Sequence, residues 1–260
     1  MPRFCANISL LYPELPFPDR IAAAARSGFS AVELQFPYEY EAGMLAERLR
    51  DANVELVLHN LPPGNAAKGE RGIACLPGRE QEFREGLERG IEYARTLGCK
   101  QLNCLSGLIP ESLPREEALA TLAGNLRHAD ATLKKAGIRL LVEAINTYDV
   151  PGFAMHRSQQ VLDLIAAHGL ENTWLQYDVY HMQRMEGELA RTLEDKLHRI
   201  AHIQIADNPG RHEPGTGEIR YPYLFELLDR LGYSGWIGCE YIPLHDTDSG
   251  LGWMPGRKPA

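Results

Sequence analysis

The sequence predicts an α/β fold, a TIM (β/α)8 barrel that forms a single domain over residues 1–260. Three observations support this prediction. Short apolar or β-branched runs alternate with longer amphipathic stretches along the whole chain, which is typical of repeated βα units around a parallel sheet. Eight such repeats fit into about 250 residues, the usual size of this barrel. No low-complexity tract or linker divides the chain, so one domain is expected.

Each predicted element follows from its local pattern. The strands are short runs bounded by turn residues, and they cover residues 4–10, 31–36, 54–60, 100–105, 138–145, 173–178, 201–206 and 235–241. The helices follow the 3.6-residue apolar period, and they cover residues 19–26, 43–52, 80–97, 115–136, 156–168, 188–199 and 221–231. Several helices are followed by a glycine before the next strand, as at Gly98 and Gly137, which is typical of a helix C-terminus.

The segment 61–79 has too little periodicity for a helix and is predicted to be a large loop after the third strand. In a barrel this loop lies on the face that carries the chemistry. The main alternative fold is a doubly wound sheet. No G-x-G-x-x-G or Walker phosphate loop follows any strand, so the nucleotide-binding form of that alternative lacks support and no organic cofactor is expected.

Composition excludes several classes of function. A hydrophobic content of 44% and a charged content of 24% are those of a soluble globular chain, and no apolar run approaches the roughly 20 residues that span a bilayer. Lys and Arg total 27 against 35 Asp and Glu, and a net charge of -8 argues against a nucleic-acid partner. The five cysteines include no Cys-x-x-Cys pair, so a reducing cytoplasm is expected. The sequence is compatible with a monomer and with a homo-oligomer.

Oxygen-bearing side chains lie at or near the ends of the last four predicted strands. They are Glu143, Asp178, Gln204 and Glu240. Carboxylates are costly to bury unless a positive charge neutralises them, and a divalent cation would do so. Such hard oxygen ligands favour Mg²⁺ or Mn²⁺, with Zn²⁺ left open. The alternative is that these are ordinary residues after strands, and that Gln204 is a hydrogen-bonding core residue.

The chain also resembles the hydroxypyruvate isomerase family, part of the xylose-isomerase-like barrels that include the ketose 3-epimerases. The resemblance runs nearly end to end and rests on HNLPPGN at His59, GERGIACLPGRE at Gly69, EAINTYDVPGF at Glu143, QYDVYHMQRMEGEL at Gln176, HIQIADNPGRHEPGTGEI at His202 and GWIGCEY at Gly235. It implies a metal held by Glu143, Asp178, Gln204 and Glu240, with Glu143 and Glu240 as the acid/base pair. The epimerases usually have His where this chain has Gln204.

The resemblance implies that the substrate is a small hydroxy/keto acid, and that hydroxypyruvate is converted to tartronate semialdehyde. A base removes a proton from the hydroxyl-bearing carbon to give an enediolate, and an acid returns a proton to the neighbouring carbon. A metal-assisted hydride shift is the other route. The alternatives are a 2-oxo-tetronate isomerase or another ketose/aldose isomerase or epimerase, a barrel that binds a sugar acid without catalysis, and an endonuclease for damaged DNA. The last needs clustered His ligands and a basic groove, which the sequence does not show.

Five residues are candidate substrate contacts. His181 lies three residues after Asp178 in a D-x-x-H pattern that the epimerases share, with a loop histidine that caps the next helix as the alternative. Asp149 lies where the epimerases have an acidic contact, with a simple loop turn before Pro151 as the alternative. His59 ends the third strand, where a core histidine is the alternative. A carboxylate substrate also needs a cationic partner, for which Arg71 and Arg211 are chosen over the alternative that each is a solvated charge.

Overall fold

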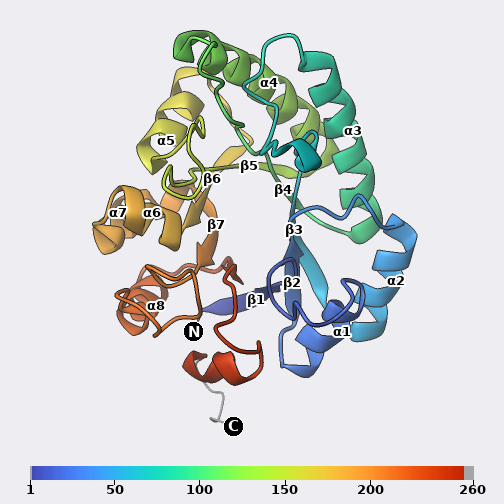
Figure 1. The fold of residues 1–260 in the computed structure, drawn as a ribbon, viewed down its shortest axis with the longest axis vertical. Coiled ribbons are helices and arrows are strands. Elements are labelled where there is room, and N and C mark those ends of the chain that lie inside the picture. Colours follow the sequence, from blue (N-terminus) through green and yellow to red (C-terminus); the bar gives the residue numbers. More distant parts are fainter. Residues whose placement is uncertain (1, 255–260) are drawn as a thin grey trace.

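A computed structural model describes residues 2–254, which fold into a closed barrel of eight parallel strands (Figure 1). The strand order around the barrel is the order in the sequence, β1 to β8, and this confirms the predicted fold. The predicted domain limits 1–260 include Met1 and residues 255–260, which lie outside the described residues. The strands are β1 Arg3–Asn7, β2 Ala31–Leu34, β3 Glu55–Asn60, β4 Gln101–Asn103, β5 Arg139–Glu143, β6 Thr173–Asp178, β7 Ile200–Ile205 and β8 Trp236–Cys239.

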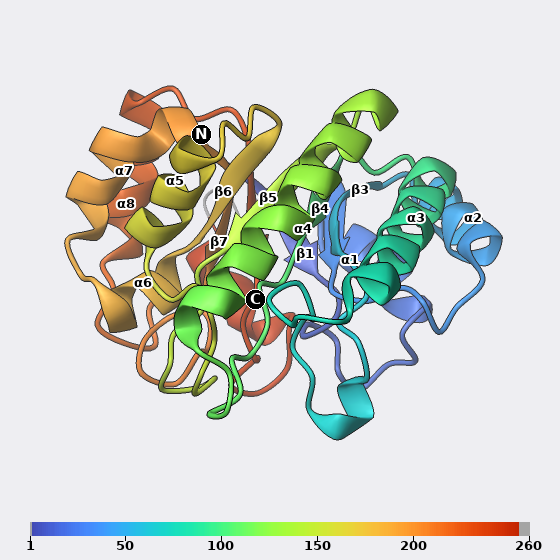
Figure 2. The same cartoon turned by 90° about the horizontal axis from the view of Figure 1, so that it is seen from above.

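The helices form an outer ring around the barrel (Figures 1 and 2). They are α1 Asp19–Arg26, α2 Ala42–Ala52, α3 Glu80–Leu97, α4 Arg115–Ala136, α5 Ser158–Ala167, α6 Val179–Met185, α7 Leu189–Lys196 and α8 Tyr221–Arg230. Helices α3 and α4 each end at a glycine in the left-handed region, Gly98 at φ +72° and Gly137 at φ +70°. A residue with a Cβ is strained there, which explains why glycine ends these helices.

Four short elements differ from the sequence prediction. Helix α6 was not predicted, because seven residues are too few to show a helical period, and the side chain of Asp178 initiates it by accepting from the backbone N–H of Tyr180 and His181. The predicted helix 188–199 is divided into α7 and the 3₁₀ turn η2, Leu197–Arg199. The predicted loop 61–79 contains a single 3₁₀ turn, η1, Ala66–Lys68. A last turn, η3, covers Ser249–Trp253.

Most of the core lies between the helices and the strands. Helix α3 shows the pattern, because Phe83, Leu87, Ile91 and Ala94 recur at helical spacing and are all buried. Inside the barrel, a smaller apolar cluster contains Cys5, Ala31, Val57, Leu58 and Leu141, with Trp174, Ala201 and Trp236 packed against it. These residues lie at the starts or near the middles of their strands, so the apolar cluster fills the N-terminal part of the barrel and leaves the C-terminal end for polar groups.

The strand register brings polar residues together toward the C-terminal end. Glu143 is paired with Gln176, and Asp178 is paired with Gln204, whose next partner is Gly238 of β8. Glycine is required at Gly238 because a Cβ there would collide with the carboxylate of Glu33. The long loops that follow the strands gather at this end, in the lower part of Figure 2.

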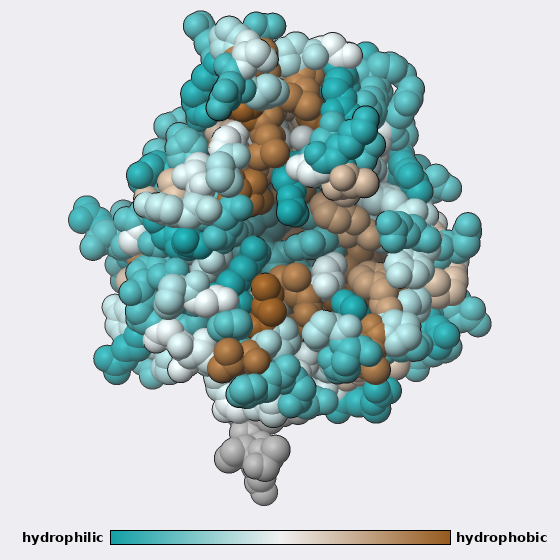
Figure 3. Space-filling model, viewed as in Figure 1, coloured by the Kyte–Doolittle hydropathy of each residue, from teal (hydrophilic) through white to brown (hydrophobic). Residues whose placement is uncertain are grey.

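The face formed by these loops is hollowed near its centre, with apolar side chains beside the hollow and hydrophilic ones along the rim (Figure 3). Among residues 2–254, no helix has the length and apolar character needed to cross a membrane.

Candidate active site

Four acidic or imidazole side chains converge in the barrel at the C-terminal ends of its strands. Glu143 ends β5, Asp178 ends β6, His181 lies in the first turn of α6, and Glu240 directly follows β8. All four are buried, and each offers one ligand atom within 4.8 Å of the others. Three of the four side chains predicted from strand ends are therefore in one cluster.

The three carboxylates disfavour one another's ionisation. Burial raises the pKa of Glu143 well above its usual range, and the nearby Glu240 and Asp178 raise it further. Burial and Glu240 together raise the pKa of Asp178 to about 7. Burial also raises the pKa of Glu240. These groups can all be ionised near neutral pH only if a positive charge joins them.

The donor set fits a divalent cation. Asp178 uses Oδ1 to accept from the backbone N–H of Tyr180 and His181, while its Oδ2 is buried without a hydrogen-bond partner in the structure. An unpartnered buried carboxylate oxygen beside two further carboxylates is a costly arrangement on its own. Oxygen donors of this kind are those that hard divalent cations prefer. Glu143, Asp178 and Glu240 could therefore hold such an ion.

Gln204 lies beside this cluster with both polar atoms of its amide already engaged. Its Oε1 accepts from Nε2 of Gln176 at 2.6 Å, and its Nε2 donates to Oε1 of Glu33 at 2.8 Å. This is the hydrogen-bonding core arrangement that the sequence left open. A role for Gln204 as a metal ligand remains a prediction, and it would require Oε1 to exchange Gln176 for the ion.

Glu33 is a buried acidic residue that the sequence analysis missed. His202 Nε2 lies 2.5 Å from its Oε2, and Asn7 donates to its Oε1 at 2.9 Å. Burial alone would raise the pKa of Glu33, but His202, Gln204 and Asn7 together lower it. Asn7 also donates to Oε1 of Glu240 at 3.2 Å, so hydrogen bonds connect Glu33 to the acidic cluster.

Arg211 supplies a positive charge at the cluster. Its Nη2 donates to Oε2 of Glu240 at 2.8 Å, and its guanidinium lies 5.3 Å from the ring centre of Tyr180. Glu240 and Asp178 outweigh the effect of burial and raise the pKa of Arg211. The structure thus places this predicted residue at the site, and its contact with a substrate carboxylate remains a prediction.

The segment that carries Arg211 is shaped by Asp207. This buried carboxylate accepts from the backbone N–H groups of four residues, which are Asn208, Gly215, Gly217 and Ile219. The backbone N–H of Arg211 in turn donates to the Asp207 carbonyl at 2.8 Å. The Asp207 side chain therefore joins both ends of the segment 207–219, which backbone hydrogen bonds such as that of the Glu218 N–H to the Asn208 carbonyl also hold together.

Asp149 lies near the site but is held by other residues. It forms an ion pair with Arg184 and accepts from the hydroxyl of Tyr180 at 2.8 Å and from Nδ2 of Asn146 at 3.0 Å. These contacts together lower its pKa against the effect of burial. A direct contact between Asp149 and substrate remains a prediction.

The other two predicted contacts lie outside the four-residue cluster. His59 is buried at the end of β3, where its Nδ1 lies 3.1 Å from the Asn60 carbonyl, and burial lowers its pKa to about 4. Arg71 is exposed in the loop after β3, and among residues 2–254 no hydrogen bond or ion pair joins it to the cluster. Their contacts with substrate remain predictions.

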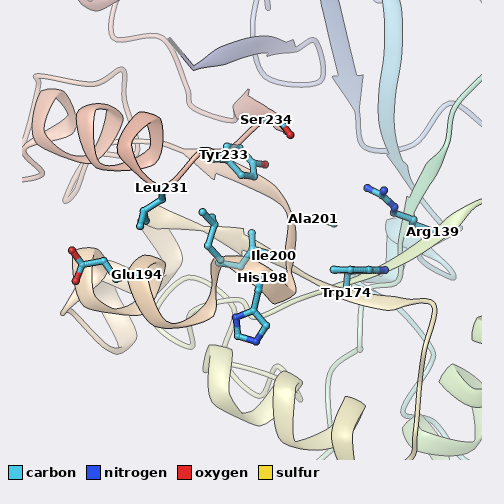
Figure 4. A pocket seen from close by; sticks show the side chains of 12 residues that line it. Arg139, Trp174, Glu194, His198, Ile200, Ala201, Leu231, Tyr233 and Ser234 are labelled. Atoms are coloured by element: carbon cyan, nitrogen blue, oxygen red, sulfur yellow. The ribbon is translucent and has the colours of Figure 1, made fainter.

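A second hollow, of about 600 Å³, lies at the opposite end of the barrel (Figure 4). Its lining includes Arg139, Trp174 and Ala201, which lie at the starts of β5, β6 and β7. None of the predicted site residues lines it. Since barrels of this kind carry their chemistry at the C-terminal ends of the strands, the acidic cluster is the candidate active site.

Comparison with known proteins identifies the family of the chain. The sequence profile of the xylose isomerase-like TIM barrels matches residues 21–256. The chain belongs to this family. It is 51% identical over 254 residues to the hydroxypyruvate isomerase of Escherichia coli K12, with 98% of each chain covered. It is 46% identical to the 2-oxo-tetronate isomerase of Cupriavidus necator, again with 98% of each chain covered.

Solved structures show the same fold. A structure described as an AP endonuclease, family 2, from Brucella melitensis superposes with a TM-score of 0.96 at 43% identity, covering 99% of this chain and 100% of that one. An L-ribulose 3-epimerase superposes with a TM-score of 0.78 at 22% identity, covering 97% of this chain and 85% of that one. The second likeness is one of fold alone.

Proposed function

We propose that the protein is an isomerase that interconverts hydroxypyruvate and tartronate semialdehyde (2-hydroxy-3-oxopropanoate). The observation that carries the proposal is the buried cluster of Glu143, Asp178 and Glu240 with Arg211 at its side. The identity of 51% with a hydroxypyruvate isomerase over nearly the whole chain supports the choice of substrate.

The reaction needs a base, an acid and a means of holding a small anion. One of Glu143 and Glu240 removes a proton from the hydroxyl-bearing carbon C3, and the resulting enediolate receives a proton at C2 from the other glutamate. The hydroxyl proton passes from O3 to O2, so substrate and product have the same composition. When no ion is bound, burial raises the pKa of both glutamates, which favours the protonated form that the acid needs.

A divalent cation is proposed as the resident cofactor, with Mg²⁺ or Mn²⁺ favoured over Zn²⁺ by the oxygen donors. Glu143, Asp178 and Glu240 would hold it, with Gln204 as the fourth predicted ligand. When bound, it supplies positive charge that stabilises the negative oxygens of the enediolate. Arg211 would bind the substrate carboxylate, and its contact with Glu240 at the cluster supports this role.

Proton NMR of the purified protein with hydroxypyruvate and with 2-oxo-tetronate tests the substrate. We expect the higher kcat/KM for hydroxypyruvate. A higher value for the tetronate would favour the second candidate function, which the 46% identical 2-oxo-tetronate isomerase supports. Turnover in D₂O separates the two routes, because proton transfer admits solvent deuterium at carbon and a hydride shift does not.

Two matched variants test the acid/base assignment. Glu240→Gln keeps the shape of the side chain but cannot exchange a proton, so we expect a loss of kcat of at least about 100-fold with folding retained. Glu117→Gln is the control, because Glu117 is exposed in the first turn of α4. Wild-type turnover by Glu240→Gln would remove the acid/base role and leave sugar-acid binding without catalysis as the better hypothesis.

The remaining proposals concern partners and location. The proposed partner is a small hydroxy/keto-acid substrate, and binding of nucleic acid is not proposed. Both a monomer and a homo-oligomer are compatible with the proposal. Salt-sensitive binding to abasic DNA would contradict this and support an endonuclease. The proposed location is the cytoplasm, which the five buried, unpaired cysteines support.

A further inference from the structure

Asn146 lies three residues after Glu143 and is fully buried, with its side-chain amide held in one orientation. Its Oδ1 accepts from the backbone N–H groups of Tyr148 at 3.1 Å and Asp149 at 2.9 Å. Its Nδ2 lies 3.0 Å from Oδ2 of Asp149. A flipped amide would set its NH₂ against two N–H donors and its oxygen against a carboxylate, so only the observed orientation satisfies all three contacts.

This orientation determines where His181 carries its proton. Nδ2 of Asn146 lies 2.7 Å from Nδ1 of His181. Because Nδ2 is a donor, Nδ1 must accept and is therefore unprotonated. The neutral ring then carries its hydrogen on Nε2.

Nε2 of His181 faces the acidic cluster without a short hydrogen bond to it. It lies 3.8 Å from Oε1 of Glu143 and 3.6 Å from Oδ2 of Asp178. Both distances exceed those of an ordinary hydrogen bond. The Nε2–H group is therefore directed into the site and is free to donate to a ligand there.

The same geometry argues against His181 as a metal ligand, although it lies close enough to the carboxylates to be one. An imidazole nitrogen that binds a metal is unprotonated, and the other ring nitrogen donates its hydrogen to an acceptor. Here the other nitrogen, Nδ1, faces the donor group of Asn146 instead. Metal binding through Nε2 would place two donors against each other.

We propose that Asn146 is a positioning residue that holds His181 as the neutral Nε2–H tautomer, so that the substrate contact already predicted for His181 is made by a hydrogen-bond donor to the oxygen that becomes negative in the enediolate. A neutral histidine can stabilise such an oxygen without binding the metal. The tautomer follows from the hydrogen bonds of this chain alone, whereas the donation to substrate rests on the proposed function.

The tautomer can be measured directly in metal-free protein labelled with ¹⁵N-histidine. Long-range ¹H–¹⁵N correlation spectra distinguish a protonated ring nitrogen from an unprotonated one, and the signals missing from His181→Leu assign the residue. We expect Nε2 protonated and Nδ1 unprotonated in the wild type. A proton on Nδ1 would overturn the proposal.

Asn146→Asp provides the perturbation, because the carboxylate keeps an acceptor for the two backbone N–H groups and puts an acceptor in place of the donor that faces both Nδ1 of His181 and Oδ2 of Asp149. We expect the Nδ1 of His181 to become protonated in this variant. Asn65→Asp is the control, since Asn65 is exposed and its side chain accepts from the Lys68 N–H, as Asp would. An unchanged His181 spectrum in folded Asn146→Asp would contradict the positioning role, and if this variant does not fold the wild-type spectrum still decides.

Calorimetric titration with Mg²⁺ and steady-state kinetics distinguish whether His181 is a hydrogen-bond donor to substrate or a metal ligand. We expect His181→Leu and His181→Gln to bind Mg²⁺ within about twofold of the wild type, whereas Glu143→Gln loses at least about tenfold. We expect His181→Leu to lose about 100-fold in kcat, the usual effect of removing one donor to an oxyanion, and His181→Gln, which keeps an N–H, to recover about tenfold of it. Weaker Mg²⁺ binding by His181→Leu than by Glu143→Gln, or equal kcat in the two histidine variants, would overturn the donor role. An inactive wild type with the expected tautomer would refute the proposed function and leave the role of Asn146 standing.

Discussion

Asp207→Asn is expected to destabilise the protein and to reduce its activity through the segment that carries Arg211. The two carboxylate oxygens of Asp207 divide four backbone donors between them. Oδ1 accepts from Asn208 and Ile219 at 3.0 Å each, and Oδ2 accepts from Gly215 at 2.8 Å and Gly217 at 2.9 Å. Asparagine keeps only one oxygen, so its NH₂ group must face one of the two pairs of N–H groups.

The magnitude follows from the two donors that lose their acceptor. A buried donor left unsatisfied costs about 1–3 kcal/mol. Gly215 and Gly217 are exposed, so water can accept from their N–H groups and compensate in part for the lost hydrogen bonds. The lower end of that range therefore applies to each. The loss in the free energy of unfolding is then about 2–3 kcal/mol in total. At about 2–4 °C per kcal/mol for a chain of this size, Tm falls by about 4–12 °C.

Thermal melts followed by circular dichroism measure this change, and kcat/KM of the folded protein at 25 °C measures its effect on Arg211. We expect kcat/KM to fall at least about tenfold, because the guanidinium that contacts Glu240 is no longer fixed. Asp246→Asn is the control, since exposed Asp246 accepts from the backbone and hydroxyl of Ser249, and an asparagine there can keep both contacts. Equal Tm values for the two variants would refute the role assigned to Asp207.

Three further predictions concern the same end of the barrel. The pKa of His59 is about 4 in the fold against 6.5 unfolded, so the unfolded chain binds the extra proton and the free energy of unfolding falls by about 3 kcal/mol as the pH drops from 7 to 4. Urea unfolding at both pH values measures this, and we expect the free energy of unfolding of His59→Gln to fall correspondingly less than that of the wild type. An equal fall in the two proteins would contradict the lowered pKa of His59. In Gly238→Ala the new Cβ would overlap with the carboxylate of Glu33, and we expect the free energy of unfolding to fall by about 1–3 kcal/mol in the same assay. Gly124→Ala on α4 is the control, because a Cβ there meets no atom within 4 Å. Mg²⁺ binding at pH 7 should release protons, because the pKa of Glu143 and Asp178 is raised without the ion. Calorimetry in buffers of different ionisation enthalpy measures this release. Equal binding heats in all buffers would show that no protons are released.

The fold was predictable because its signals are local and repeated. Each strand is a short apolar run and most helices show a clear period, so all eight strands were placed to within a few residues. Helix α6 was missed because its cause is a single side chain, Asp178, which accepts from the first turn. A seven-residue helix offers no period to detect, and its presence follows from capping rather than from amphipathicity.

The site was predictable where strand ends carry carboxylates, and Glu143, Asp178 and Glu240 do converge. Asn7 and Glu33 were missed because they lie within the predicted strands 4–10 and 31–36 and not at their ends. Their partners could not be predicted, because the contact between Glu33 and His202 joins residues 169 positions apart across the barrel. Likewise, the orientation of Asn146 depends on the turn that follows it and not on residue type.

The charges inside the barrel give an independent reason to expect a cation. Four carboxylates are buried there. Glu240 contacts the guanidinium of Arg211, and Glu33 is hydrogen-bonded by Asn7 and Gln204 and lies 2.5 Å from Nε2 of His202. Glu143 and Asp178 lie beside His181, whose burial lowers its pKa well below the usual range and keeps it neutral. Two carboxylates thus remain without a compensating charge in the described part of the chain, and in a buried site they must either bind protons or share a cation. A divalent ion carries the charge that both together require, and the unpartnered Oδ2 of Asp178 is already available to bind it.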